Sequence, residues 1–496
     1  MSDRLEDVIK SRKEKLGRFR QAGLDPYPST SERTHTNQQA SDNFDALADT
    51  SITLVGRIRS WRDMGKITFI HIEDSTAKIQ ALFKEEDFQN NNDNNNYKFF
   101  VKNFDIGDFI QVTGKLFKTK TEEKTLSVIN YKLLAKSILP LPSEHFGLVD
   151  EETRLRKRYL DILFNSEAKE LFIKKAKFWD SMRSFMQEKG FLHMDMPILE
   201  SVPGGAEAKP FLTHHNALDK DFFLRISLEL PLKKMLVAGY EKVFEIGRIF
   251  RNEGIDTEHL QDYTQMEFYW AYANFDDMMD LVREMYKKVI LDTFGTLSIT
   301  AHGQTVDWSG TWEKISYIEI FKKHTGIDLL KASDDELRTY CDKNKLKYES
   351  FAGRGRLIDL IFKGVREEIP TDKPVFLVDQ PVELEPLAKR DPKNPKLVQR
   401  MQILAYGTEL GKGFGELNDP LDQRLRFEEQ MKLRAQGDEE AQMADESYVE
   451  AIEYGMPPAA GFGVSERLFS VLADKSIRET VVFPLMKSSL TSKQKI

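Results

Sequence analysis

The chain has 496 residues, of which 40% are hydrophobic, 11% aromatic and 31% charged. Its 72 basic and 80 acidic residues leave a formal net charge of −8, and its single cysteine excludes an internal disulfide and a Cys-rich zinc site. This composition is typical of a soluble globular protein of about three domains, and it excludes a collagen-like, mucin-like or wholly disordered chain. Because no apolar run of about 18 residues occurs, no transmembrane helix is expected. The expected compartment is the cytoplasm, where thiols stay reduced.

The first predicted element is an amphipathic helix over residues 1–20, with seven basic and four acidic side chains. Two interpretations stay open: a solvated surface helix, or a basic strip that contacts phosphates. Residues 24–50 are rich in Pro, Ser, Thr, Asn and Asp, which predicts a linker. Residues 1–50 are therefore expected to form an N-terminal basic helix and linker.

Short runs of strand-forming residues follow between residues 51 and 140. The predicted strands cover residues 52–59, 67–72, 78–83, 108–114 and 126–131. Five short strands in a segment of this length suit a small Greek-key barrel of the OB type, which often presents one face to single-stranded nucleic acid.

Residues 141–496 are predicted to form one larger domain in which helices and strands mix. Its predicted elements, in chain order, are a helix over 154–189, a helix over 275–293, a helical insertion around 315–370, a helix over 420–436 and an apolar strand over 477–486. The fold class expected for the whole chain is α+β.

Three clusters of charged residues and glycines carry the candidate chemistry, and the first is a predicted hairpin. Its strands alternate apolar and charged residues around a long loop, which would place Arg251, Glu253, Glu267 and Tyr269 on one face. Several charges on one side of a sheet are costly unless a charged ligand completes them. The alternative is the solvated face of an edge hairpin.

The second and third clusters both point to phosphate chemistry. Glu409, Glu416 and Asp419 are carboxylates among glycines, and such hard oxygens suit magnesium, which usually also takes phosphate oxygens. Arg467 follows a Gly-rich strand at a predicted helix start, where an arginine and backbone N–H groups can hold a phosphate. An ordinary interhelical salt bridge is the alternative for Arg467.

In this order and spacing, the clusters resemble the class II aminoacyl-tRNA synthetases, and the lysine-specific family among them. The strings that carry the resemblance are Gly204–Leu218, Leu224–Leu230, Glu241–Asp256, Glu416–Pro420, Tyr454–Pro458 and Ile477–Pro484. The resemblance implies an antiparallel catalytic sheet flanked by helices. It also implies a homodimer, whose contact is built by the helix before Gly190 and the strand through Pro197.

The resemblance implies that the barrel binds the anticodon of tRNA. Phe69 would stack on an anticodon base, Gln80 would hydrogen-bond to one, and Arg62 is a further candidate. A base–aromatic stack is worth about 1–3 kcal/mol. The alternative for Phe69 is an aromatic of the barrel core.

The implied reaction is the ATP-dependent activation of L-lysine to lysyl-adenylate, followed by transfer of the lysyl group to the 3′ end of tRNA(Lys). By the resemblance, ATP is bound by Arg251, Glu253, His259, Tyr263 and Arg467, of which Arg251, Glu253 and Arg467 are catalytic. Lysine is bound by Gly205, Glu229, Glu267, Tyr269, Phe414 and Glu416. Glu409 would bind Mg²⁺, which is the implied cofactor.

Individual roles follow from the same resemblance. Arg251 would bridge the lysine carboxylate and the α-phosphate, and Glu229 would take the α-ammonium. Glu416 with Tyr269 would take the ε-ammonium, since a buried carboxylate left unpaired is costly and rejects neutral side chains.

Three departures from the family pattern leave alternatives open. Gln402 stands where a second metal-binding glutamate is common, so the number of metal ions is open. Lys412 stands where an asparagine is common, and the segment before Arg467 is one residue shorter. An enzyme for aspartate or asparagine is disfavoured because Glu416 would repel an acidic substrate. A paralogue that modifies a protein, or binds RNA without catalysis, is kept open by Gln402 and Lys412.

Overall fold

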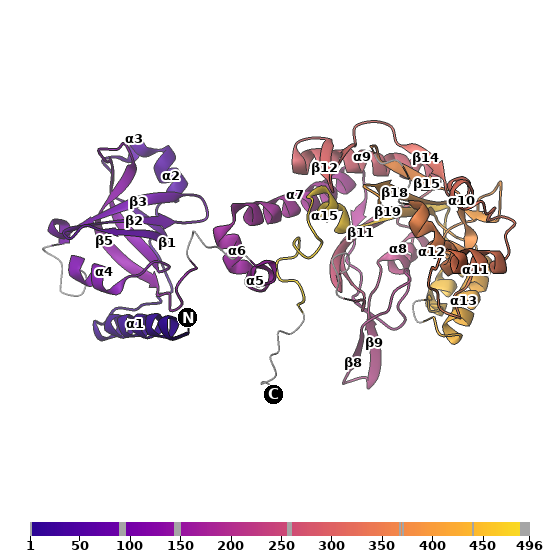
Figure 1. Cartoon of the computed structure of the whole chain (residues 1–496), viewed down its shortest axis with the longest axis horizontal. Coiled ribbons are helices and arrows are strands. Elements are labelled where there is room, and N and C mark those ends of the chain that lie inside the picture. The colour runs from indigo at the N-terminus through magenta and orange to yellow at the C-terminus, as the bar shows by residue number, and fades with distance from the viewer. Residues whose placement is uncertain are drawn as a thin grey trace. The chain divides into compact units, whose positions relative to one another are not determined.

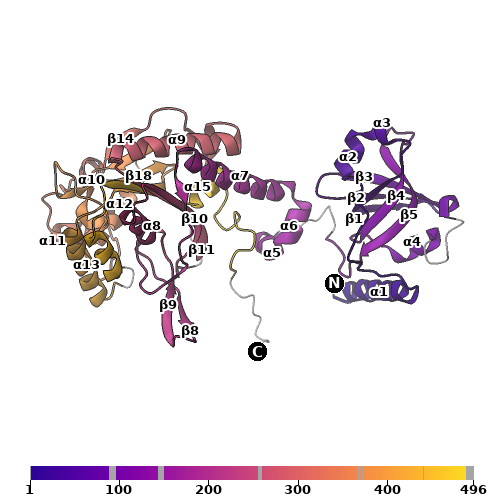
Figure 2. The same cartoon turned by 180° about the vertical axis from the view of Figure 1, so that it is seen from behind.

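The computed structural model describes residues 2–88, 96–142, 150–254, 260–366, 369, 372–438 and 441–486. The chain divides into two compact units, Met1–Gly147 and Leu148–Ile496, which Figures 1 and 2 show from opposite sides. Among the described residues, no helix combines the length and the apolar character that crossing a membrane requires.

The N-terminal unit contains a closed five-stranded barrel, as the strand pattern predicts. Its strands are β1 (Ile52–Asp63), β2 (Ile67–Glu73), β3 (Lys78–Lys84), β4 (Phe109–Lys118) and β5 (Lys124–Ala135), in the order β1-β2-β3-β5-β4. Neighbouring strands are antiparallel except for the parallel pair β3 and β5. The predicted OB-type barrel is confirmed.

Alternation along β2 separates the inside of the barrel from its outer face. Thr68, Ile70 and Ile72 are buried, whereas Phe69 and His71 between them are half-buried. Because successive side chains of a strand point to opposite faces, Phe69 lies on the outer face and is not a core aromatic.

Residues 24–50 differ from the predicted linker. They include the short helices α2 (Asn37–Asp42) and α3 (Phe44–Leu47), and Ala40 and Phe44 belong to the buried core of the barrel. Although this segment is mostly polar, these two apolar residues anchor it to the core of the barrel. The unit also contains η1 (Glu85–Phe88) and α4 (Tyr97–Asn103), which supplies the buried Phe100.

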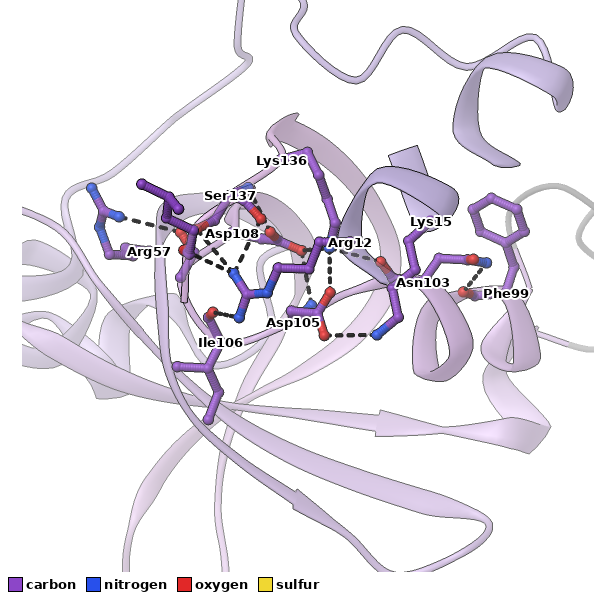
Figure 3. A network of polar contacts seen from close by, with 12 residues as sticks. Arg12, Lys15, Arg57, Phe99, Asn103, Asp105, Ile106, Asp108, Lys136 and Ser137 are labelled. Carbon is purple, nitrogen blue, oxygen red and sulfur yellow. Dashed lines mark hydrogen bonds and ion pairs between the residues drawn. The ribbon is translucent and has the colours of Figure 1, made fainter. Parts of the chain in front are cut away.

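Helix α1 (Ser2–Gln21) is held on this unit by a network of buried polar groups (Figure 3). Arg12 donates from its guanidinium to the carbonyl oxygens of Ile106 at 3.0 Å and Ser137 at 3.1 Å. Lys15 Nζ lies 2.7 Å from Asp105 Oδ1. These two basic side chains of α1 therefore act as structural anchors, not as free phosphate contacts.

The centre of the network is Lys136, whose side chain is fully buried. Its Nζ donates to Asp105 Oδ2 at 2.6 Å, Asp108 Oδ2 at 2.7 Å and the Asn103 carbonyl oxygen at 2.9 Å. Removing one partner of a buried ion pair typically costs about 3–5 kcal/mol, because the remaining charge is left uncompensated.

Replacing Lys136 with methionine is therefore expected to destabilise the N-terminal unit by about 3 kcal/mol. The free energy of opening would be measured by native-state hydrogen exchange of the barrel amides in the full chain. Lys115→Met, at an exposed position of β4, is the control and should change this free energy by less than about 0.5 kcal/mol. Equal protection in both variants would show that the network does not stabilise the unit.

The second unit is built on an eight-stranded sheet. In spatial order the strands are β14 (Glu313–Ser316), β15 (Val375–Val378), β18 (Arg400–Ala405), β19 (Thr408–Gly415), β20 (Ala459–Ser465), β11 (Asp262–Ala271), β10 (Lys242–Phe250) and β6 (Leu192–His193). The central pairs are antiparallel, and the two edge pairs, β14 with β15 and β10 with β6, are parallel. The predicted antiparallel sheet flanked by helices is confirmed.

Two hydrophobic cores cover the opposite faces of this sheet. On one face, α7 (Ser166–Glu188) and α9 (Phe275–Phe294) pack against side chains such as Phe268 of β11. On the other face, α8 (Glu229–Val237), α13 (Pro420–Ala435) and α14 (Glu446–Glu453) form a core that includes the neighbouring Tyr269. Figures 1 and 2 show α7 and α9 beside one another.

The segment predicted as a helical insertion contains three helices, which share a hydrophobic core with β15 and β18 of the sheet. They are α10 (Tyr317–Thr325), α11 (Asp334–Lys343) and α12 (Arg354–Arg366). The remaining elements are β7 (Leu199–Glu200), β8 (Leu212–His215), β9 (Lys220–Leu224), β12 (Ser298–Ala301), β13 (Gln304–Asp307), β16 (Gln380–Pro381), η2 (Val382–Leu384), β17 (Leu397–Val398) and α15 (Arg467–Leu472).

Two predicted elements are wrong. The helix predicted over 154–189 is three helices, α5 (Glu151–Arg156), α6 (Arg158–Phe164) and α7. The break before α7 occurs because the Asn165 side chain accepts hydrogen bonds from the first turn of α7 and starts a new helix. The strand predicted over 477–486 is absent from its described residues. Its backbone hydrogen bonds form local turns instead, such as the bond from the Thr480 N–H to the Ile477 carbonyl oxygen.

Candidate active site

A cavity of about 220 Å³ lies on the α8 face of the sheet. Tyr263, Gln265, Glu267 and Tyr269 all line it, because alternate residues of β11 point to the same side. The prediction that Glu267 and Tyr269 share a face is confirmed. Arg251 and Glu253, which follow the end of β10, line the same cavity.

Glycines of β20 keep the floor of the cavity open. Gly461 and Gly463 pair with Phe414 and Lys412 of β19, so all four lie on the cavity side. A Cβ atom added at Gly461 would collide with the Tyr269 ring and with Glu416 Oε1. The Gly-rich sequence that suggests a phosphate site therefore also makes room for a ligand above the sheet.

Two guanidinium groups and a carboxylate from distant parts of the chain line this cavity. Arg251, Arg467 and Glu409 all line it, although they come from the end of β10, the start of α15 and β19. Arg251 Nε donates to the Ile226 carbonyl oxygen at 3.2 Å, and its guanidinium carbon lies 5.7 Å from the centre of the Tyr263 ring. Such an arrangement suits a polyphosphate beside a flat ring. His259 lies outside the described residues.

A second part of the cavity lining is acidic. Glu267 Oε1 accepts hydrogen bonds from Ser227 Oγ at 2.8 Å and the Leu228 N–H at 3.1 Å, and Tyr269 Oη donates to Glu267 Oε2 at 2.8 Å. Burial raises the pKa of Tyr269, so its hydroxyl keeps the proton that it donates. The Glu267 carboxylate is therefore held in a fixed orientation inside the cavity.

Glu229 and Gly205 complete this acidic part of the cavity lining. Glu229 is the first residue of α8, and its N–H donates to Ser227 Oγ at 3.2 Å. Gly205 has a φ of +82°, and a Cβ atom there would collide with Ser227 and Glu229. A glycine is thus required at 205 by both its backbone conformation and its close approach. We call the group Gly205, Ser227, Glu229, Glu267 and Tyr269 the acidic slot.

Glu416 does not line the cavity. Its carboxylate lies beside Gly461 on the side of the Tyr269 ring and contacts Lys233 Nζ, which also lies 2.5 Å from Glu229 Oε1. Burial raises the pKa of Glu416 and of Glu229. Burial alone would lower the pKa of Lys233, but the attraction of the two carboxylates outweighs it and leaves that pKa above its usual value.

The structure also places the two residues that depart from the family pattern. Gln402 Nε2 donates to Glu409 Oε2, and Gln402 Oε1 accepts from Gln380 Nε2 at 3.1 Å. Lys412 lines the same cavity, and its Nζ lies 3.4 Å from Glu385 Oε2 and 5.4 Å from the centre of the Phe414 ring. Its charge is therefore paired with a carboxylate of the protein.

Sequence reasoning missed Ser227, which belongs to the acidic slot, and Lys233, which contacts Glu229 of the slot. A local signal existed for Lys233, because it follows Glu229 by four residues on one helix, the spacing at which opposite charges meet. No sequence signal joins Lys233 to Glu416, which comes from another part of the chain.

The three anticodon candidates share one outer face of the barrel. Arg62 of β1 is directly opposite Phe69 of β2, and Gln80 of β3 is opposite His71. Gln80 Nε2 donates to Glu123 Oε2 at 2.9 Å, and Glu123 Oε1 lies 2.9 Å from His71 Nε2. The aromatic ring, an exposed guanidinium and a fixed amide thus lie within a few residues of each other on adjacent strands.

Comparison with known proteins gives matches over both units. Residues 150–487 match the family model of class II tRNA synthetases (D, K and N), and residues 52–140 match that of the OB-fold nucleic acid binding domain. A lysine–tRNA ligase of Carboxydothermus hydrogenoformans is 43% identical over 97% of this chain and 98% of its own length. Those of Pelotomaculum thermopropionicum and Porphyromonas gingivalis are 42% and 40% identical over 97% and 96% of this chain, and over 95% and 85% of their own lengths.

Proposed function

The chain belongs to the lysine–tRNA ligase family of class II tRNA synthetases, and from that membership we propose how its cavity divides between ATP and lysine. The enzyme activates L-lysine with ATP and transfers the lysyl group to tRNA. One observation carries the proposal: two guanidinium groups, the Glu409 carboxylate and the acidic slot line a single cavity.

We assign the part of the cavity lined by the two guanidinium groups to ATP. Tyr263 stacks on adenine, Arg467 holds the outer phosphates, and Arg251 bridges the α-phosphate and the lysine carboxylate, as its place between Tyr263 and the acidic slot allows. Glu253 belongs to the same part, and His259 is assigned to the outer phosphates from the sequence alone.

We assign the acidic slot to lysine. Glu229, beside Gly205, takes the α-ammonium, and Glu267 with Tyr269 takes the ε-ammonium, while Phe414 forms the apolar wall along the methylene chain. Glu416, whose carboxylate lies beside Gly461 and Tyr269 and contacts Lys233, stays assigned with Tyr269 to the ε-ammonium. A neutral side chain of equal length would leave the slot carboxylates unpaired, which explains selection for lysine.

Neither step of the reaction needs a nucleophile from the protein. In the first step a lysine carboxylate oxygen attacks the α-phosphorus of ATP, the bond to the β-phosphate bridging oxygen breaks, and pyrophosphate leaves. In the second, the 3′-terminal ribose hydroxyl attacks the lysyl carbonyl carbon and AMP leaves. The residues orient the two substrates and stabilise charge at the α-phosphate, which are large sources of rate enhancement.

Exchange of labelled pyrophosphate into ATP tests this assignment across the twenty standard amino acids. We expect exchange with lysine alone. Exchange with aspartate or asparagine would reassign the acidic slot, and absence of exchange with every amino acid would refute the proposed activation step.

Magnesium is the cofactor that the family implies, and the cavity fits it through one carboxylate. Among the described residues, no group of three His, Cys, Asp or Glu side chains could hold a metal by itself. Glu409 lines the cavity, and Gln402 occupies one of its oxygens. Mg²⁺ commonly takes one or two carboxylates and completes its shell with phosphate oxygens and water, and it neutralises phosphate charge when bound.

Replacing Gln402 with glutamate is expected to strengthen divalent-cation binding about tenfold or more, because a second carboxylate replaces an amide that occupies Glu409. The dissociation constant of Mn²⁺ would be measured by electron paramagnetic resonance with and without ATP. The double variant Gln402→Glu/Glu409→Gln is the control and should lose the gain. Equal Mn²⁺ affinity of the wild type and Gln402→Glu would contradict the assignment of Glu409.

We also propose that residues 51–140 bind the anticodon through Arg62, Phe69 and Gln80, that residues 1–50 support this domain, and that residues 141–496 are the catalytic domain. The proposal is supported by the match to a nucleic acid binding domain and by the outward position of Phe69. Glu123 fixes the amide of Gln80.

Replacing Phe69 with alanine is expected to raise the KM for tRNA(Lys) about tenfold or more, because one base–aromatic stack is worth about 1–3 kcal/mol. Lysine-dependent pyrophosphate exchange should stay within twofold of the wild type, since the catalytic cavity belongs to the other unit. Ile129→Ala, at another exposed apolar position of the barrel, serves as the control. A change in exchange without a change in KM for tRNA would exclude the anticodon role.

We propose further that the chain forms a homodimer in the cytoplasm. Four apolar residues of α7, β6 and the segment through β7 are between 44% and 55% exposed, which favours a covered surface; they are Ile173, Leu192, Ile198 and Leu199. The only cysteine is free and buried, which agrees with a reducing compartment. Sedimentation equilibrium should give a mass of twice 57.4 kDa.

A further inference from the structure

A second cavity, of about 470 Å³, adjoins the one assigned to ATP and lysine, and two cationic residues line both. These residues are Arg251 and Lys412. The other walls of the second cavity come from the start of α12, from η2 and from α13. Arg251 is already assigned to the lysine carboxylate and the α-phosphate, so Lys412 is a second cation available beside the substrate site.

The register of the sheet places Lys412 opposite the acidic slot. Lys412 of β19 pairs with Gly463 of β20, and Gly463 pairs with Glu267 of β11. Lys412 and Glu267 both line the cavity, and two strand spacings separate their backbones by about 10 Å. Because the residue between them is a glycine, a ligand can lie over Gly463 with its cationic end at Glu267 and its anionic end at Lys412.

The contact between Lys412 and Glu385 leaves the lysine able to change partners. Its Nζ lies 3.4 Å from Glu385 Oε2, whereas a close charge-assisted hydrogen bond is about 2.7–2.9 Å long. The Lys412 side chain is also 37% exposed, and ion pairs of such exposure contribute little to stability. Glu385 is 6% exposed and has Arg400 Nε at 3.8 Å, so it keeps a cation beside it if Lys412 turns away.

We propose that Lys412 is a further catalytic residue of the activation step: its ammonium group leaves Glu385 and, together with Arg251, contacts the lysine carboxylate where this group approaches the α-phosphate. The inference rests on the proposed function and adds a substrate contact to it. The attacking carboxylate and the α-phosphate are both anionic, and a second cation reduces their mutual repulsion. No proton moves in this step, so Lys412 acts through its charge alone.

Replacing Lys412 with methionine and with arginine tests the charge. Lys412→Met should lower kcat of lysine-dependent pyrophosphate exchange about 100-fold, as the loss of one donor at a developing charge does, and Lys412→Arg should stay within tenfold of the wild type. Calorimetric titration with lysine and with lysinol gives a second measurement, because lysinol has a hydroxyl group in place of the carboxylate. Lys412→Met should weaken lysine binding about tenfold and leave lysinol binding within twofold.

Lys432→Met is the matched control, since this lysine of α13 lines the second cavity and not the first. It should leave kcat and both affinities unchanged. Glu385→Gln separates a substrate contact from a purely structural ion pair. It should keep lysine affinity within threefold of the wild type, because Lys412 no longer has to leave a carboxylate.

Three results would overturn the inference: wild-type kcat in Lys412→Met, an equal loss of lysine and lysinol binding in that variant, or a loss of lysine affinity in Glu385→Gln as large as that in Lys412→Met. If Lys412→Met does not fold, Lys412→Gln takes its place with the same expected values.

Failure of the proposed function gives a different result. If the wild type exchanged pyrophosphate with no amino acid, or with one other than lysine, the assignment of the cavity would be wrong. If the wild type exchanged with lysine and Lys412→Met kept its kcat, only the inference about Lys412 would be wrong.

Discussion

Replacing Arg251 with glutamine is expected to lower lysine-dependent pyrophosphate exchange by about 1,000-fold or more, since losing even one preorganised donor at a developing charge costs 10²–10³-fold. The guanidinium lines the cavity 5.7 Å from the centre of the Tyr263 ring, and its Nε is anchored 3.2 Å from the Ile226 carbonyl oxygen, next to Ser227 of the acidic slot. It can thus bind two anionic groups in fixed geometry, which an amide cannot. The rate of exchange at saturating lysine and ATP is the measurement.

Arg248→Gln is the control for this loss. Arg248 lies on β10 three residues before Arg251, and it contacts Asp262 outside the residues that line the cavity. Its replacement should change the exchange rate by less than about threefold, as expected of an ion pair that is 40% exposed. An Arg251→Gln enzyme within tenfold of the wild-type rate would remove Arg251 from the reacting centre.

Replacing Glu267 with glutamine is expected to lower kcat/KM for lysine by about 1,000-fold, while the KM for ATP stays within threefold. Ser227, Leu228, Gln265 and Tyr269 donate hydrogen bonds to the two carboxylate oxygens. A glutamine would bring an NH₂ group against some of these donors and would remove the charge that pairs with the ε-ammonium. Both effects act in a buried site, where an unmatched polar group costs about 1–3 kcal/mol.

Glu241→Gln, at an exposed position next to β10, is the control and should leave kcat/KM for lysine unchanged. The ratio of kcat/KM for lysine to that for norleucine gives a second readout. This ratio should fall in Glu267→Gln, because the loss of the carboxylate affects the charged substrate alone. An unchanged ratio would mean that another group recognises the ε-ammonium.

Patterns among neighbouring residues predicted most of the helices and strands. The alternation of apolar and polar residues predicted all five barrel strands and the β10–β11 hairpin, and helical periodicity predicted α9 and α13 within one or two residues. The pattern failed where a side chain changed the local geometry, as at Asn165 between α6 and α7. It also failed over 477–486, where an apolar run closes local turns and has no neighbouring strand to pair with.

The candidate site was also predicted only in part from the sequence. Residue types and spacing brought Arg251, Glu267, Tyr269, Glu409 and Arg467 into one hypothesis, and all five line one cavity. Sequence could not show that Phe69 faces outward, because a strand pattern does not say which face the barrel encloses until its partner strands are in place. It also could not show that Lys412 is directed to Glu385, since that contact joins distant segments.

The sequence by itself determined the family, the two kinds of domain and the residues available for phosphate and ammonium binding, because these depend on strings of neighbouring residues. Only the tertiary structure decided which carboxylates are available to a substrate. Glu267 lines the cavity, whereas Glu416 is buried beside Gly461 and Tyr269 and is paired with Lys233. The physical reason is that burial and pairing of a charge are set by contacts between helix and sheet, and these contacts join residues that no local pattern connects.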